Sequence, residues 1–95
     1  MTKQYLRSDR LVYRHIAGEH LLIDLRSKSE IPFFSLTESA VPLWQTLEAW
    51  SSSERLVERL RQEYDITPEQ ATADVAEFLG HLETIGALNV RETEE

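Results

Sequence analysis

The residues that most often carry out chemistry in proteins are few in this chain, and their spacing suits no common site. The histidines are His15, His20 and His81, and cysteine is absent. No two histidines stand three or four residues apart and no H-E-x-x-H pattern occurs, so the usual spacing of a metal site is missing. The lack of cysteine excludes disulfides, thiolate catalysis and cysteine-ligated zinc. We therefore expect no bound metal, and histidines that lie on the surface or between paired strands.

A nucleophilic, phosphate-binding or acid–base site is equally hard to build. No serine stands in a G-x-S-x-G pattern, and the glycines Gly18, Gly80 and Gly86 are too scattered for a phosphate-binding loop. The carboxylates fall at capping or solvent-facing helix positions, whereas acid–base catalysis needs groups held in a cleft with shifted pKa values. The sequence thus predicts a protein that is not an enzyme, with no catalytic residue and no cofactor. A weak enzyme is the least favoured alternative.

Length and composition limit the function further. The chain has 95 residues, of which 41% are hydrophobic, which is enough for one small domain over residues 1–95 but leaves little room for a deep catalytic pocket. We expect a core over about residues 10–90 and a frayed, charged tail over residues 91–95. Residues 1–10 are polar and no apolar run approaches the ~20 residues of a membrane span. The sequence therefore predicts a soluble, cytoplasmic protein.

The charge balance argues against nucleic acid as a partner. Asp and Glu number 17 against 10 Lys and Arg, which gives a formal net charge of −7, and an acidic surface repels phosphate backbones. A DNA-binding winged helix needs Arg, Lys, Asn or Gln on its recognition helix. Residues 66–90 contain no Lys or Arg, so a DNA-binding winged-helix protein is only a minor alternative.

The elements that would position a site begin with a β-hairpin. Residues 11–16 and 20–25 are rich in β-branched, aromatic and alternating apolar residues, and the Gly-containing segment 17–19 between them is typical of a hairpin turn. In the second strand, alternation gives two faces. One face carries Leu21, Ile23 and Leu25, and the other carries His20, Leu22 and Asp24.

Three helices are predicted after the strands. Apolar residues recur at helical spacing from about residue 37 or 39 to 50, from 51 to 64 and from 67 to 85. The second helix begins with a capping box that starts at Ser51, and the third begins with Thr67 as its cap and a proline at its first position. Strands followed by helices indicate an α+β domain.

An open strand edge is the remaining candidate for a site. Residues 31–35 predict a short third strand, and Pro32 favours a sheet edge because proline has no N–H to donate. Unpaired N–H and C=O groups at such an edge accept a peptide as an added strand, and pockets beside the edge give selectivity. The sequence therefore favours binding over catalysis. A protein–protein interaction or scaffold module is the second hypothesis.

Three segments of the chain resemble one family. Residues 19–24 (EHLLID) resemble its second strand, residues 34–44 (FSLTESAVPLW) its strand-to-helix join, and residues 74–88 (DVAEFLGHLETIGAL) its last helix. Their order and spacing, over roughly residues 10–90, are similar to those of the PqqD-like family, also called RiPP recognition elements. The resemblance implies a winged helix-turn-helix-like α+β fold with a three-stranded antiparallel sheet followed by three helices.

The resemblance also implies a function. In this family the leader segment of a ribosomally made precursor peptide pairs with the third strand and lies in the groove between that strand and the third helix. The chain is therefore expected to be a non-catalytic, chaperone-like protein of natural product biosynthesis. It would bind a leader peptide and present it to a peptide-modifying enzyme of the radical-SAM maturase or leader protease class. Quinone-cofactor synthesis and lasso-peptide maturation are both compatible with this expectation.

The peptide-binding residues follow from the same resemblance. Phe33 and Phe34 point to opposite faces because strand side chains alternate, so one is expected to line the groove and the other to belong to the core. Asp74 and Glu77 are either solvated or hold a basic residue of the leader at the groove rim. The implied set is Glu30, Ile31, Pro32, Phe33, Phe34 and Ser35 from the strand and Asp74, Val75, Glu77, Phe78, His81 and Leu82 from the helix.

Overall fold

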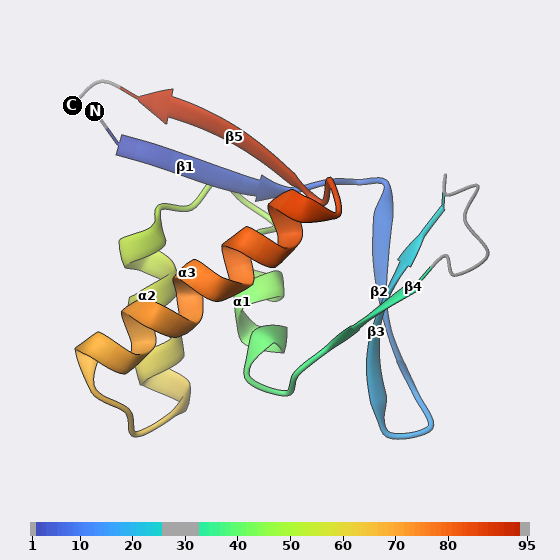
Figure 1. Ribbon diagram of the computed structural model, residues 1–95, viewed down its shortest axis with the longest axis horizontal. Helices are drawn as coiled ribbons and strands as arrows, with labels where there is room; N and C mark the ends of the chain where they lie inside the picture. Colours follow the sequence, from blue (N-terminus) through green and yellow to red (C-terminus); the bar gives the residue numbers. More distant parts are fainter. Residues whose placement is uncertain (1, 26–32, 94–95) are drawn as a thin grey trace.

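The computed structural model describes residues 2–25 and 33–93, which form five strands and three helices. In Figure 1 a two-stranded sheet lies along one side of the helices and a three-stranded sheet lies at their end. The strands are β1 (Thr2–Arg7), β2 (Leu11–Ile16), β3 (Glu19–Asp24), β4 (Phe33–Leu36) and β5 (Leu88–Thr93), and the helices are α1 (Ala40–Thr46), α2 (Ser53–Glu63) and α3 (Pro68–Thr84).

The three-stranded sheet confirms the predicted hairpin and the α+β fold. Its order is β2-β3-β4 and both pairings are antiparallel. Ala17 and Gly18 form the two-residue turn between β2 and β3, and both have positive φ angles, 52° and 81°, as a type I′ hairpin turn requires. The third strand starts at Phe33 and extends to Leu36, one residue beyond the predicted range. The predicted positions 30–32 lie outside the described residues.

The two-stranded sheet was not predicted. β1 and β5 pair antiparallel from Thr2↔Thr93 to Arg7↔Leu88, so the expectation of a frayed tail is wrong for residues 91–93. Arg91 shows why this segment is ordered: its guanidinium lies 4.3 Å from the ring centroid of Trp50, and its Nε donates a hydrogen bond of 2.9 Å to Gln4. A charged residue at a chain end is thus held by an aromatic face and a strand pairing.

The helix starts show which local signals were interpreted correctly. Thr67 caps α3 by accepting a bond of 3.1 Å from the backbone N–H of Gln70, as predicted. The cap of α2 is Ser52, which accepts from the N–H of Arg55 at 3.2 Å, so the predicted capping box at Ser51 is wrong. Ser51 is instead buried, and its hydroxyl donates to backbone carbonyls of the preceding turn. α1 also ends earlier than predicted, at Thr46.

The hydrophobic core lies between the helices and one face of the three-stranded sheet. Leu22 in β3 is fully buried and Leu11 in β2 is 4% exposed, so the face of β3 that carries Leu22 is the inner one. Leu21 and Ile23 alternate with Leu22 and lie on the outer face. The buried apolar cluster consists of Leu11, Leu22, Ala40, Leu43, Trp44, Leu47, Leu56, Leu60, Ala71, Val75, Phe78, Leu79, Leu82 and Ala87.

Arg10 joins the three-stranded sheet to the end of α3. Its Nε lies 3.2 Å from a carboxylate oxygen of Asp24, and its Nη2 donates to the carbonyl of Ile85 at 2.8 Å. The guanidinium thereby satisfies a free carbonyl at the helix C-terminus and opposes the negative end of the helix dipole. Gly86, with φ of 72°, leaves the space for it, because a Cβ there would lie 3.1 Å from Nη2.

We expect Arg10→Met to lower the free energy of unfolding by about 1–3 kcal/mol, because it removes a charged hydrogen bond and leaves the largely buried Asp24 without this cation. Arg14→Met is the matched control. The Arg14 side chain is exposed and donates only to the carbonyl of its neighbour Tyr13, so its loss should change stability by less than about 0.5 kcal/mol. Urea unfolding of both variants measures the difference, and equal losses would contradict the assignment.

Candidate functional site

The open edge of β4 is the first feature of the candidate site. β4 lies at one end of the order β2-β3-β4, and in the described residues it pairs with β3 alone. In an antiparallel pair, alternate residues direct their N–H and C=O groups toward the partner strand. The other residues of β4 therefore direct theirs away from β3, where no described strand receives them. A free backbone edge of this kind was the condition that the sequence-based hypothesis required.

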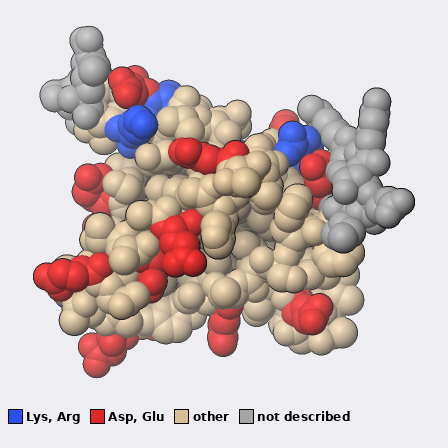
Figure 2. All heavy atoms as spheres, in the orientation of Figure 1, with Lys and Arg blue, Asp and Glu red and all other residues tan. Residues whose placement is uncertain are grey.

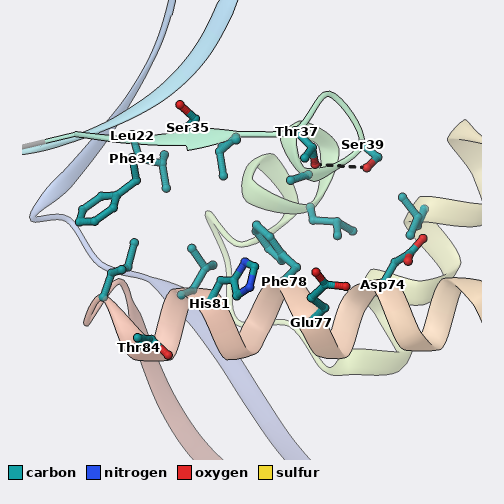
Figure 3. A pocket seen from close by; sticks show the side chains of 16 residues that line it. Leu22, Phe34, Ser35, Thr37, Ser39, Asp74, Glu77, Phe78, His81 and Thr84 are labelled. Atoms are coloured by element: carbon teal, nitrogen blue, oxygen red, sulfur yellow. Dashed lines mark hydrogen bonds between the residues drawn. The ribbon is translucent and has the colours of Figure 1, made fainter.

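A groove of about 530 Å³ lies beside this edge. One wall is formed by β4 and the segment that leads into α1, and the other is formed by α3 (Figure 3). Its volume is in the range of ordinary binding sites. The lining residues are Leu22, Phe34, Ser35, Leu36, Thr37, Ser39, Ala40, Leu43, Leu60, Asp74, Glu77, Phe78, His81, Leu82, Thr84 and Ile85.

The helical wall has an apolar part and a polar rim. Phe78 and Leu82 are buried, whereas Glu77 and His81 are exposed. The two pairs stand on adjacent lines of the helix, because residues three or four apart share a face. Figure 3 shows the carboxylate of Glu77 and the ring of His81 directed from α3 toward the groove. The helix therefore offers an apolar surface beside a row of hydrogen-bonding groups.

The sheet wall settles which phenylalanine faces the groove. Phe34 and Leu36 are half-buried, pack against the core and line the groove. Phe33 points to the opposite face and is 46% exposed. The expectation that the second phenylalanine belongs to the core is therefore wrong: β4 has solvent on its outer side, because the described elements pack only against the inner face of the sheet. Leu22 of β3, which pairs with Phe34, also lines the groove.

The structure gathers most, but not all, of the predicted set around the groove. Phe34, Ser35, Asp74, Glu77, Phe78, His81 and Leu82 line it. Val75 does not: it is 1% exposed and belongs to the core, because its position on α3 is turned toward the other helices. Phe33 is likewise absent from the lining. Glu30, Ile31 and Pro32 lie outside the described residues.

Several lining residues were missed by the sequence-based prediction. Leu36, Thr37, Ser39 and Ala40 line the groove because the chain passes directly from β4 into α1 at this point. The FSLTESA segment already marked this strand-to-helix join, so its side chains were available as a signal. Thr84 and Ile85 extend the helical wall by one turn. They continue the spacing of His81 and Leu82, a second signal that went unused.

Nothing in the described residues suggests catalysis or metal binding at the groove. No group of three or more His, Asp or Glu side chains in residues 2–25 and 33–93 is placed to hold a metal ion. None of the helices described combines the length and hydrophobicity needed to cross a bilayer. An α+β domain with an open strand edge beside an apolar, helix-walled groove belongs to the class of peptide-binding modules rather than to any class defined by reacting side chains.

Comparison with known proteins places the chain more closely. It belongs to the PqqD family: the model of that family, described as coenzyme PQQ synthesis protein D, matches residues 19–88. This match runs from β3 to the end of α3 and so includes both walls of the groove.

A solved structure adds to the family match. The chain is similar to TbiB1, solved in complex with the TbiA(β) leader peptide, with a TM-score of 0.73 and 25% sequence identity over 94% of this chain and 99% of that one. No match was found among curated proteins.

Proposed function

We propose that this chain is a non-catalytic, chaperone-like protein that binds the leader segment of a ribosomally made precursor peptide and presents it to a modifying enzyme. The observation that carries the proposal is the free edge of β4 beside the groove walled by α3. Membership of the PqqD family and the similarity to TbiB1, whose structure contains a leader peptide, support it.

The physical basis of binding is addition of the leader as a fourth strand. Each backbone hydrogen bond contributes a net ~0.5–1.5 kcal/mol, and β4 has only four residues. The strand pairing alone is therefore weak and insensitive to sequence. Apolar side chains of the leader, buried in the groove at ~25 cal/mol per Å², supply the remaining affinity and the selectivity.

An NMR titration tests this proposal. The ligand is the leader segment of a short precursor peptide encoded beside the gene of this protein, added to the uniformly ¹⁵N-labelled full chain. We expect the largest shifts at residues 33–37 and 74–85, because these ranges form the two walls. Shifts restricted to the two-stranded sheet or to α2 would refute the groove as the binding site.

We assign the contact with the modifying enzyme to the outer face of the three-stranded sheet. Three of the four large apolar side chains that are most exposed in the described residues lie on this face: Ile16 at 51%, Leu25 at 64% and Phe33 at 46%. A leader added next to β4 extends the same sheet, so alternate leader residues become part of the same outer surface. An enzyme that covers this surface contacts protein and substrate together. A radical-SAM maturase or a leader protease is the class of enzyme that we propose.

A double substitution separates docking of the enzyme from binding of the leader. Ile16→Ser combined with Leu25→Ser should lower the rate of leader processing by the modifying enzyme at least ~10-fold, since two exposed apolar contacts near the centre of an interface each contribute on the order of 1 kcal/mol. Leader affinity should stay unchanged. Val90→Ser, which removes a similarly exposed side chain from β5, is the control and should leave processing intact. A normal processing rate in the double variant would contradict the assignment.

A further inference from the structure

The groove has two chemically different ends. In Figure 3, Asp74 and Glu77 lie at the end where Thr37 and Ser39 lead into α1, whereas Phe34 lies toward the other end. β4 and α3 run in opposite directions along the groove in this view, so the C-terminal end of β4 faces the earlier turns of α3. One end therefore presents carboxylates and hydroxyls, and the other presents apolar side chains.

The charged end has no cation of its own among the described residues. Asp74 and Glu77 line the groove, and no Lys or Arg does. Asp74 accepts a hydrogen bond of 2.8 Å from the side-chain amide of Gln70, a neutral partner. Figure 2 shows acidic side chains along the face of the molecule that carries α3. A peptide that covers these carboxylates without offering a cation would remove them from water uncompensated, which is unfavourable.

We propose that this acidic end selects leaders that carry a Lys or Arg on the N-terminal side of the apolar anchor. The inference rests on the proposed function and names the substrate class of the same groove. Both pairings of the sheet are antiparallel, and an added strand that keeps this pattern runs opposite to β4. Its N-terminal part then lies at the C-terminal end of β4, beside Asp74 and Glu77.

The spacing between the two leader residues follows from element geometry. From the midpoint of Asp74 and Glu77 to Leu82, α3 advances ~10 Å at ~1.5 Å per residue. An extended peptide covers that distance in about three residues at ~3.3 Å each. Since only every second residue of a strand faces the helix, the basic residue is placed two or four positions before the apolar anchor.

The test is a selection from a displayed library of random 12-residue peptides against the immobilised full-length protein and two variants. In Asp74→Asn/Glu77→Gln the groove carboxylates are neutral. The control Glu58→Gln/Glu83→Gln has the same net charge but leaves the groove unchanged, because neither residue lines it. We expect the native protein and the control to enrich an apolar residue preceded by Lys or Arg. The groove variant should keep the apolar preference, lose the basic one and bind the selected peptides about tenfold more weakly at low salt.

The outcomes distinguish the inference from the function beneath it. An apolar consensus with no basic preference on the native protein would overturn the charge selection and leave peptide binding in place. Loss of the basic preference in the control as well would also overturn it, since net charge would then be the cause. Failure to enrich any apolar consensus would overturn the proposed function itself. Thermal melts of both variants establish that each is folded during selection.

Discussion

Replacing Phe34 by alanine is expected to weaken leader binding by about 10- to 70-fold. Phe34 is half-buried and lines the groove, so part of its ring is available to a bound peptide. Losing ~60–100 Å² of apolar contact at ~25 cal/mol per Å² corresponds to about 1.5–2.5 kcal/mol of binding free energy. Fluorescence anisotropy with a labelled leader peptide measures the change.

Phe33→Ala is the matched control for this substitution. The two residues are adjacent in β4 and of the same type, but Phe33 is on the outer face and does not line the groove. Its replacement should change leader affinity by less than about threefold, because it removes no contact within the groove. If Phe33→Ala weakened binding as much as Phe34→Ala, the leader would not lie against the inner face. Circular dichroism checks that both variants are folded.

The parts of the fold that were predicted from sequence depend on local signals. The turn at Ala17 and Gly18 and the cap at Thr67 are each encoded within a few residues, and such patterns need no knowledge of the rest of the chain. The groove was predicted in outline through the family resemblance, which brought β4 and α3 together. Composition and spacing alone suggested only an open edge.

The two-stranded sheet was missed because its cause is not local. Tyr5 pairs with Val90, and its backbone also exchanges two hydrogen bonds with Ser51, at 2.8 and 2.9 Å. Each segment is polar when considered alone, and only the distant pairing makes it a strand. The same contact explains the error at the start of α2. Ser51 is held in this bridge, so Ser52 is left to cap the helix.

The inner face of β3 is where alternation was least informative. Leu21, Ile23 and Leu25 look like the apolar face by composition, because the other face contains His20 and Asp24. The structure buries the other face nonetheless, around Leu22. The polar residues there have partners: His20 lies 2.6 Å from the hydroxyl of Tyr13, and Asp24 pairs with Arg10. Polar side chains that are satisfied in this way are compatible with an inner face.

Leu22→Ala should therefore lower the free energy of unfolding by about 3–5 kcal/mol, whereas Leu21→Ala should lower it by less than about 1.5 kcal/mol. Leu22 has no exposed surface and its removal leaves a cavity beneath Phe34, while Leu21 is only half-buried. Because small domains are stable by only ~5–15 kcal/mol, the difference is readily measured by urea unfolding. Equal losses would mean that the sheet packs with the opposite face inward. In that case Phe33, and not Phe34, would face α3, and a bound leader would direct its anchors to the other side of β4.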